Sequence, residues 1–383
     1  MTDKAETLTM GIEEEYLLVD PETRQLPSDA KRRQAVIDRV TDLVDDSIGF
    51  ATPEFLSVQV EVGTSVCQSV KETRKNLGSL RRAVAQAAGE YGLAPIAAST
   101  HPMANWRDIA HTDKERYNLL ANDMQTVAHR LLICGMHVHV GIESDDLRVD
   151  LLPQITYFLP HLLALTTSSP FWSGKDTGLM CYRLAIFDEL PRTGLPERFD
   201  SWSEYERHIR ILTDVGVIEN ASKIWWDIRP HHHFPTLEMR IADICTNIDD
   251  GIAVAALYAG LISMLIRLRR ANQKWREYSN MLIVENRWRA QRYGIDGGLI
   301  DFGCGRIVPY DQLLEELFTL CHEDFQRLDC IDEAAHARTI VNDGTSAHRQ
   351  KKIYQQTMES GATHEQALET VVDWLISETV RGL

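Results

Sequence analysis

The sequence predicts an α+β fold, in which a sheet has helices on one face. Five segments alternate between apolar residues and residues with carboxylate, imidazole or guanidinium groups. This pattern is typical of strands with one face on the core and one polar face. Helical periodicity fills most of the intervening chain and nearly all of it after residue 249. Nothing has the composition of a linker, so we expect one domain over residues 1–383, mainly helical from about residue 250.

Composition and charge restrict the classes of function. The formal net charge of −16 argues against a nucleic-acid groove. The seven cysteines are scattered without a CxxC motif, which disfavours a disulfide framework or zinc ribbon and fits a reducing cytoplasm. Residues 1–10 lack the features of a signal peptide. The most apolar run, residues 251–266, is shorter than the ~20 residues of a membrane span and predicts a buried core helix.

The first predicted strand, residues 10–20 (MGIEEEYLLVD), contains three consecutive glutamates. Successive side chains of a strand point to opposite faces, so Glu13 and Glu15 share one face and Glu14 lies on the other. Unpaired buried charge is costly, so arginines or a divalent cation must compensate two carboxylates on a half-buried strand. Mg²⁺ prefers oxygen ligands and suits such a face. An exposed edge strand with solvated glutamates is the alternative for this segment alone.

Helices and strands continue through the N-terminal half. Residues 29–46 and 65–91 have helical periodicity with apolar stripes. A short apolar strand is predicted at residues 94–98, and an amphipathic helix at residues 114–133.

A second polar-faced strand is predicted at residues 52–64. Its later half alternates regularly, which places Glu61 on the polar face. Glu54 lies in the opposite phase unless a bulge or a loop intervenes.

Residues 134–142 (CGMHVHVGI) predict a strand with two histidines on one face. Alternation places His137 and His139 on the same side, about 7 Å apart along the strand. Both can therefore address one site. Two structural histidines with satisfied hydrogen bonds are the alternative.

The middle of the chain predicts two helices and two further polar-faced strands. The helices cover residues 151–165 and 202–212. In the strand at residues 223–229, alternation places Lys223, Trp225, Asp227 and Arg229 on one face. In the strand at residues 236–241, it places Thr236, Glu238 and Arg240 on one face. The three histidines of the PHHHFP link are expected not to converge on one ion. Near the C-terminal end, Thr363 and Gln366 fit a capping box at the start of a helix.

The polar faces together contain the parts of a site for metal-assisted phosphoryl transfer. They carry Glu13, Glu15, Glu61, His137, His139, Asp227, Arg229, Glu238 and Arg240. Carboxylates can hold Mg²⁺, Mg²⁺ bridges phosphate oxygens, and arginines neutralise the charge that moves. The chain has no GxxxxGK[ST] motif and no GxGxxG before a helix, so a P-loop or a Rossmann dinucleotide site is unsupported.

Several segments together resemble the glutamate–cysteine ligase type 2 family, and within it the YbdK-type carboxylate–amine ligases. They are GIEEEYLLVD, QVEVGT, STHP, GMHVHVGI, WDIRPHHHFPTLEMRIAD and NRWRAQRYG. The resemblance covers residues 11–294 and continues more weakly through the helical tail. It implies a glutamine-synthetase-like fold, with a curved antiparallel sheet that forms a funnel and flanking helices outside.

The resemblance also implies an activity. Members use ATP and Mg²⁺ to convert the γ-carboxylate of glutamate into an acyl phosphate and transfer the acyl group to an amine, which is cysteine in the best-known case. Residues around 170–200 show nothing that ties this chain to cysteine, so glutamate–cysteine ligation is expected to be a weak side activity. The implied partners are small-molecule substrates, without nucleic acid or membrane, and relatives suggest a homodimer.

Roles for individual residues follow from the resemblance. The implied Mg²⁺ ligands are Glu13, Glu15, Glu61, Glu238 and His137, with His139 in support. Arg240 and Arg229 would bind the transferring phosphate or the glutamate carboxylate, and Arg183 is a candidate for the substrate carboxylate. The amine must lose a proton, and Glu54 is our candidate for the base.

Two alternatives differ in class. The first is a metal-dependent hydrolase that uses the His137/His139 pair, which would hold Zn²⁺ tightly and work without ATP. The second is a non-catalytic nucleotide-binding relative. Retention of four glutamates in phase argues against the second, because an inactive site need not keep them.

Overall fold

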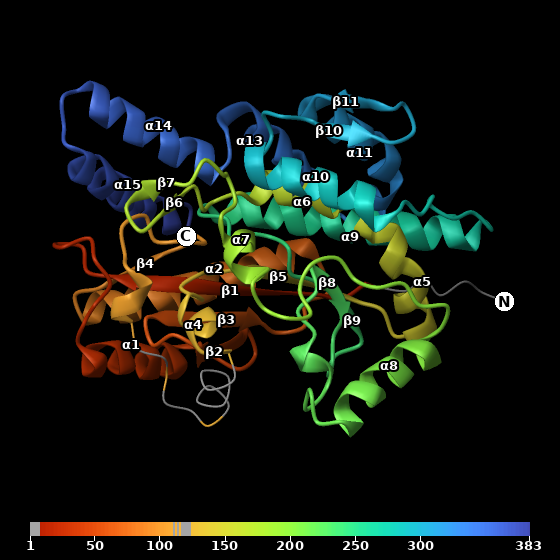
Figure 1. Ribbon diagram of the computed structural model, residues 1–383, viewed down its shortest axis with the longest axis horizontal. Helices are drawn as coiled ribbons and strands as arrows, with labels where there is room; N and C mark the ends of the chain where they lie inside the picture. The colour runs from red at the N-terminus through yellow and green to blue at the C-terminus, as the bar shows by residue number, and fades with distance from the viewer. Residues whose placement is uncertain (1–7, 110–111, 113–114, 116–123) are drawn as a thin grey trace.

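A computed structural model describes residues 8–109, 112, 115 and 124–383. Its centre is a seven-stranded sheet in the order β2-β3-β1-β5-β9-β8, with β4 beside β1 (Figure 1). All neighbouring strands that pair in this sheet are antiparallel. This confirms the α+β class. The prediction of one ligase domain over the whole chain stays a prediction.

The strand β1 is the centre of the sheet. Its first half pairs with β5 and its second half with β4, while β3 lies along its other edge. The strands of the sheet are β1 (Met10–Val19), β2 (Gly49–Pro53), β3 (Gln59–Thr64), β4 (Ala94–Ile96), β5 (Met136–Gly141), β8 (Ile228–Pro230) and β9 (Thr236–Met239).

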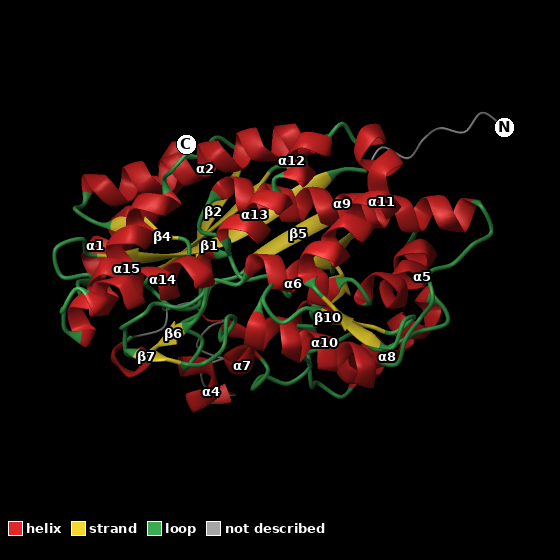
Figure 2. Cartoon of the chain, turned by 90° about the horizontal axis from the view of Figure 1, so that it is seen from above, coloured by secondary structure: helices red, strands yellow, loops and turns green. Residues whose placement is uncertain are grey.

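Two long helices, α2 (Val70–Glu90) and α9 (Ile248–Arg270), pack against the apolar face of the sheet (Figure 2). Among the described helices, α9 is the one long and apolar enough to cross a membrane, yet 89% of its most apolar window is buried inside the protein. The prediction of a buried core helix is therefore confirmed.

The remaining helices flank this core. Among them, α15 packs against α14 and against β4, and the predicted capping box of Thr363 and Gln366 at its start is confirmed. The flanking helices are α1 (Ala30–Leu43), α4 (Thr126–His129), α5 (Asp145–Thr156), α6 (Leu159–Thr166), α7 (Arg183–Phe187), α8 (Trp202–Asp214), α10 (Asn280–Tyr293), α11 (Tyr310–Arg327), α12 (Ile331–Ala335), α13 (Ala337–Asp343), α14 (Ser346–Glu359) and α15 (His364–Thr379). Two short hairpins, β6 (Phe171–Trp172) with β7 (Lys175–Asp176) and β10 (Leu299–Asp301) with β11 (Arg306–Val308), complete the fold with the 3₁₀ turns η1 (Trp106–Asp108) and η2 (Ala221–Lys223).

Three predicted elements differ from the structure. The strand at residues 52–64 is a hairpin of β2 and β3 with a loop between them. The helix at residues 151–165 is two helices, because the chain breaks after Thr156 and restarts with a proline in the first turn of α6. The strand at residues 223–229 begins only at Ile228, after the turn η2.

Most of the helix predicted at residues 114–133 lies outside the described residues. Of its described part, Thr126–His129 is helical as α4. Ile133 instead forms an isolated bridge with Thr100, so the helix ends before this residue.

A buried ion pair lies on the apolar side of the sheet. Glu14 points away from Glu13 and Glu15, as predicted, and meets Arg81 of α2, with both side chains nearly inaccessible to solvent. Two hydrogen bonds, Nη2 to Oε1 at 2.6 Å and Nε to Oε2 at 2.8 Å, join the groups. Arg81 also donates to the carbonyls of Cys245 and Thr246. This guanidinium therefore links β1 and α2 to the chain that leads into α9.

The close contact of α9 with α11 gives a stability prediction. A Cβ atom on Gly260 would lie 2.2 Å from Cε1 of Phe325, which is fully buried. We expect Gly260→Ala to lower the free energy of unfolding by about 1–3 kcal/mol, because the ring cannot move without disturbing the core. Gly89→Ala is the control, because its Cβ would meet nothing within 4 Å. It is expected to stabilise α2 by up to about 1 kcal/mol. Urea unfolding measures the change in the free energy of unfolding for both variants. A change of the same sign in both would contradict the prediction.

Candidate active site

The polar face of the sheet is a row of directly opposed side chains. The register pairs Glu61 with Glu15 across β3 and β1, and Glu13 with His137 across β1 and β5. It continues with His139 opposite Glu238 across β5 and β9. Arg229 of β8 then lies opposite Glu238. Strand alternation therefore brings together residues that are up to about 225 positions apart in the chain.

Glu13 lies at the centre of two candidate cation sites. Among the described residues, the ligand atoms of Glu13, Glu61 and His137 lie within 4.8 Å of one another, and so do those of Glu13, His139 and Glu238. The two histidines thus fall in different groups, each with two carboxylates. This arrangement disfavours the hydrolase alternative, which needs both imidazoles on one ion.

Both imidazoles are oriented by hydrogen bonds. Nδ1 of His137 lies 3.0 Å from Oε2 of Glu13, and Nδ1 of His139 lies 3.1 Å from Oγ1 of Thr236. Nε2 of His139 is buried and has no hydrogen-bond partner among the described residues, and Oε1 of Glu13 is 3.6 Å away. A buried nitrogen aimed at a carboxylate in this way suits a shared cation.

Burial and local charge set the protonation of this face. Burial raises the pKa of Glu61 well above its ordinary value, and the charges of Glu54, Glu13 and Glu15 add to this effect. Burial also opposes ionisation of Glu13, but the hydrogen bond with His137 and the nearby imidazole of His139 outweigh it and hold its pKa well below the usual range. Such crowding of buried carboxylates is what a divalent cation relieves.

The imidazole of His137 is in the form that binds a metal. Burial, followed by the charge of Arg240, lowers the pKa of His137 to about 4. The ring is therefore neutral near pH 7 and has a lone pair to offer.

Two guanidinium groups border the carboxylates at the β9 edge. Arg229 donates from Nε to Oε2 of Glu238 at 2.6 Å, and Arg240 donates from Nη1 to Oε1 of the same carboxylate. Nη1 of Arg240 is also 3.5 Å from Nδ1 of His137. Nε of Arg240 is buried, and no atom in the described part of the chain accepts a hydrogen bond from it. It can donate to an anion bound at this face.

Glu15 and Glu54 face a neighbouring cavity of about 290 Å³. Glu15 accepts a hydrogen bond from the amide of Gly135 at 2.7 Å, and burial, followed by the charge of Glu54, raises its pKa to about 7. The loop between β2 and β3 brings Glu54 to this side, which resolves the phase problem of the sequence. Glu15 lies outside both cation groups, so its role as a metal ligand stays a prediction.

Arg183 also lines this cavity, and its role at the substrate carboxylate stays a prediction. Its guanidinium makes hydrogen bonds within the protein. It donates to the carbonyls of Arg240 at 3.2 Å and Ala242 at 3.1 Å, directly after β9. A Cβ on Gly135 would lie 2.5 Å from Nη2 of Arg183, so this glycine makes room for the guanidinium. Arg183 therefore holds Arg240 in place whether or not it also meets a substrate.

Two predicted features of the later strands are wrong. Asp227 does not join the polar face, because Nε of Arg287 binds its Oδ2 at 2.7 Å in a separate buried ion pair. The segment is not a regular strand, because Lys223 ends a 3₁₀ turn and Asp227 precedes β8. Lys223, Trp225 and Arg229 nevertheless line the same cavity, so only Asp227 leaves the predicted face. Among the described residues, none of the histidines of the PHHHFP link belongs to a candidate metal group, and the expectation that they do not share an ion stays a prediction.

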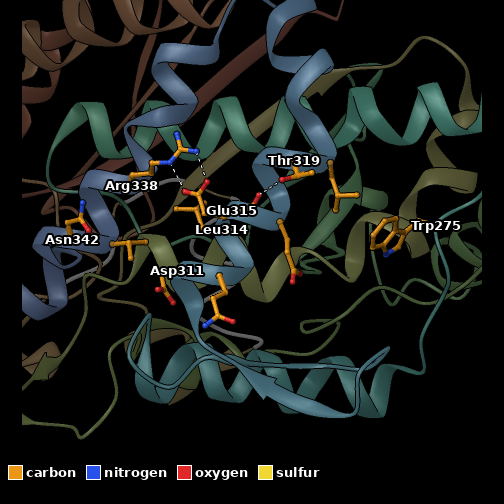
Figure 3. Close-up of a pocket in the computed structure, with 11 residues that line it drawn as sticks. Trp275, Asp311, Leu314, Glu315, Thr319, Arg338 and Asn342 are labelled. Carbon is orange, nitrogen blue, oxygen red and sulfur yellow. Dashed lines mark hydrogen bonds and ion pairs between the residues drawn. The ribbon is translucent and has the colours of Figure 1, made fainter.

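The largest cavity described lies elsewhere, on the helical side. It measures about 820 Å³ and lies along α11 and α13, with Trp275 at one end (Figure 3). A bidentate ion pair between Arg338 and Glu315 lies within it, with Nε to Oε1 at 2.6 Å. The candidate metal groups and the paired arginines lie on the sheet instead, so we place the chemistry there.

Fold and site together define the class of the protein. An antiparallel sheet with helices on its apolar face and an acidic, metal-suited opposite face is the architecture of ATP-dependent carboxylate–amine ligases, which form carbon–nitrogen bonds. Comparison of the sequence gives the particular family. The chain belongs to glutamate–cysteine ligase family 2 (GCS2), whose sequence model matches residues 9–370. The predicted family is therefore confirmed.

A curated relative agrees with this assignment. A protein from Rhodospirillum rubrum, provisionally named glutamate–cysteine ligase 2, is 58% identical over 376 residues, which are 98% of this chain and 96% of the relative.

Solved structures support the fold. A glutamate–cysteine ligase from Francisella tularensis in complex with AMP has a TM-score of 0.69 and 14% identity, covering 98% of this chain and 90% of that chain. A bifunctional glutathione synthetase from Pasteurella multocida has a TM-score of 0.67 and 12% identity, covering 97% of this chain and 52% of that chain.

Proposed function

We propose that this enzyme forms a γ-glutamyl amide from glutamate, an amine and ATP. The γ-carboxylate attacks the terminal phosphorus of ATP, which gives an acyl phosphate and ADP. The amine then forms a bond to the acyl carbon, the bond from that carbon to the phosphate oxygen breaks, and inorganic phosphate leaves. The observation that carries the proposal is that Glu13 belongs to both candidate cation groups. Each group combines two carboxylates with one imidazole, and Arg229 and Arg240 lie beside them.

The donor set fits magnesium ions with open positions for phosphate. Glu13, Glu61 and His137 would hold one ion, and Glu13, His139 and Glu238 the other. When bound, Mg²⁺ neutralises phosphate oxygens and makes the phosphorus more electrophilic. The protein holds these carboxylates in position through contacts with residues on the neighbouring strands.

The arginines and the cavity supply the other roles. Arg240, and with it Arg229, would bind the phosphoryl group as charge moves onto its oxygens. Arg183 would complete the pocket for the glutamate carboxylate. Glu54 lines the cavity beside Glu15 and is our candidate to take the proton of the attacking amine.

A third cavity, with a volume of about 470 Å³, suits the nucleotide base. It is lined by α8 residues, including Trp202 and Tyr205, and by His231. The ring of His231 packs edge-on against His139 with centroids 5.3 Å apart, so this cavity adjoins the proposed cation sites. ATP bound there would direct its phosphates toward the sheet. We also expect a cytoplasmic location and a homodimer.

Capture of the acyl group tests the proposal. We expect the purified protein with ATP, Mg²⁺, glutamate and hydroxylamine to form γ-glutamyl hydroxamate and release phosphate in equal amounts. EDTA should stop both, and added Mg²⁺ should restore them, because the carboxylates repel the phosphate oxygens unless a cation lies between them. Hydrolysis of an amide or ester without ATP, with bound Zn²⁺, would contradict the proposal and favour a hydrolase.

A further inference from the structure

The cavity beside Glu15 has walls that differ in character from its floor. The floor consists of charged and polar residues from the sheet and its edges, among them Glu15, His137 and Arg240. The walls come from loops and helix ends outside the strands. Their polar members are Glu54, Ser222 and Lys223, and their apolar members are Phe55, Leu131, Ile133, Phe187, Leu190 and Trp225.

The glutamate donor does not need these walls. Glutamate places two carboxylates and an ammonium group on a short aliphatic stem, so its binding requires mainly charged and polar groups. Cysteine as an acceptor adds a single methylene and a thiol. Apolar surface contributes to binding in proportion to the apolar area that it covers, so an extended apolar wall favours a larger apolar ligand.

The walls begin directly at the guanidinium groups of the site. Cζ of Arg183 lies 5.5 Å from the ring centroid of Phe187. Nη1 of Arg229 donates to the carbonyl of Ser222 at 2.9 Å and to that of Ile224 at 2.6 Å, which fixes the segment that carries Trp225. An amine whose nitrogen lies at the charged floor would therefore place its carbon substituent along this wall.

We infer that the acceptor is a primary amine with a branched or aromatic apolar group. The inference rests on the proposed ligase function. The amine forms the new bond to the γ-carbonyl carbon, phosphate leaves with the electrons of the broken carbon–oxygen bond, and the proton of the amine passes to Glu54.

A competition between acceptors tests the inference separately from the ligase function. The panel contains hydroxylamine, cysteine, alanine, leucine, phenylalanine, 3-methylbutylamine and 2-phenylethylamine, each with glutamate, ATP and Mg²⁺. We expect kcat/KM for the best apolar acceptor to exceed the values for cysteine and alanine by at least about tenfold. Hydroxamate formation with cysteine or alanine as the best natural acceptor would overturn the inference and leave the ligase function standing. Failure to form hydroxamate would overturn the ligase function, and the inference with it.

Adjacent tryptophans provide matched variants. Trp225 lines the cavity, whereas Trp226 packs near Phe199 with ring centroids 6.0 Å apart and is not among the lining residues. We expect Trp225→Ala to lower the ratio of kcat/KM for the best apolar amine to that for hydroxylamine by about tenfold, because hydroxylamine is too small to use the wall. Trp226→Ala should leave this ratio unchanged. An unchanged ratio in Trp225→Ala, or equal effects of the two variants, would overturn the inference.

Discussion

Glu13→Gln is expected to abolish acyl transfer almost completely, with a loss of about 10²–10³-fold or more in kcat. Glu13 is the residue that the two candidate cation groups share, so one substitution weakens both. Glutamine is close in size to glutamate but lacks the negative charge that holds a cation. The measurement is hydroxamate formation over a range of Mg²⁺ concentrations, with calorimetric titration of Mg²⁺ in the presence of ADP.

Glu143→Gln is the matched control, because this glutamate is exposed and lies just beyond β5. It should retain nearly full activity and cation binding. Glu13→Gln with full activity and unchanged Mg²⁺ dependence would show that the two cation groups are placed wrongly.

Arg81→Met is expected to lower the free energy of unfolding by about 3–5 kcal/mol, because it leaves the buried carboxylate of Glu14 without its partner. The carbonyls of Cys245 and Thr246 lose their donor at the same time. Thermal and urea unfolding measure the loss. The double variant with Glu14→Leu and Arg81→Met should lose less than Arg81→Met alone, since neither charge then stays buried and unpaired.

The exposed ion pair of Arg39 and Glu90 provides the contrast. Its side chains are 35% and 38% exposed, so Arg39→Met should leave the unfolding free energy nearly unchanged. If Arg39→Met cost as much as Arg81→Met, or the double variant lost more than the single one, burial of the Glu14 pair would not be the cause of its effect.

Strand phase made most of the polar face predictable from the sequence. Regular alternation around Glu13, His137 and Glu238 fixes which side each residue takes, and the antiparallel register then places the residues opposite one another. The core helix and the capping box are equally local patterns, and both are confirmed.

The remaining features depend on contacts that alternation does not encode. Glu54 reaches the site because a loop separates β2 from β3. Asp227 leaves it because Arg287, which is 60 positions away, binds its carboxylate. Arg81 carries a visible signal, a charged residue in a buried helical stripe, but its partner on β1 follows only from the packing of α2 on the sheet.

Closure of β4 by α15 has a consequence for the order of folding. The amide of Ala97 donates to Oγ1 of Thr379 at 2.9 Å, across 282 positions of the chain. Arg24 is likewise bound to Asp373 across 349 positions. A chain emerging from the ribosome cannot complete the β4 end of the sheet until residue 379 has been made. Contacts of such high sequence separation slow folding, so β1 and β4 would stay incompletely covered throughout synthesis and would be natural binding segments for chaperones.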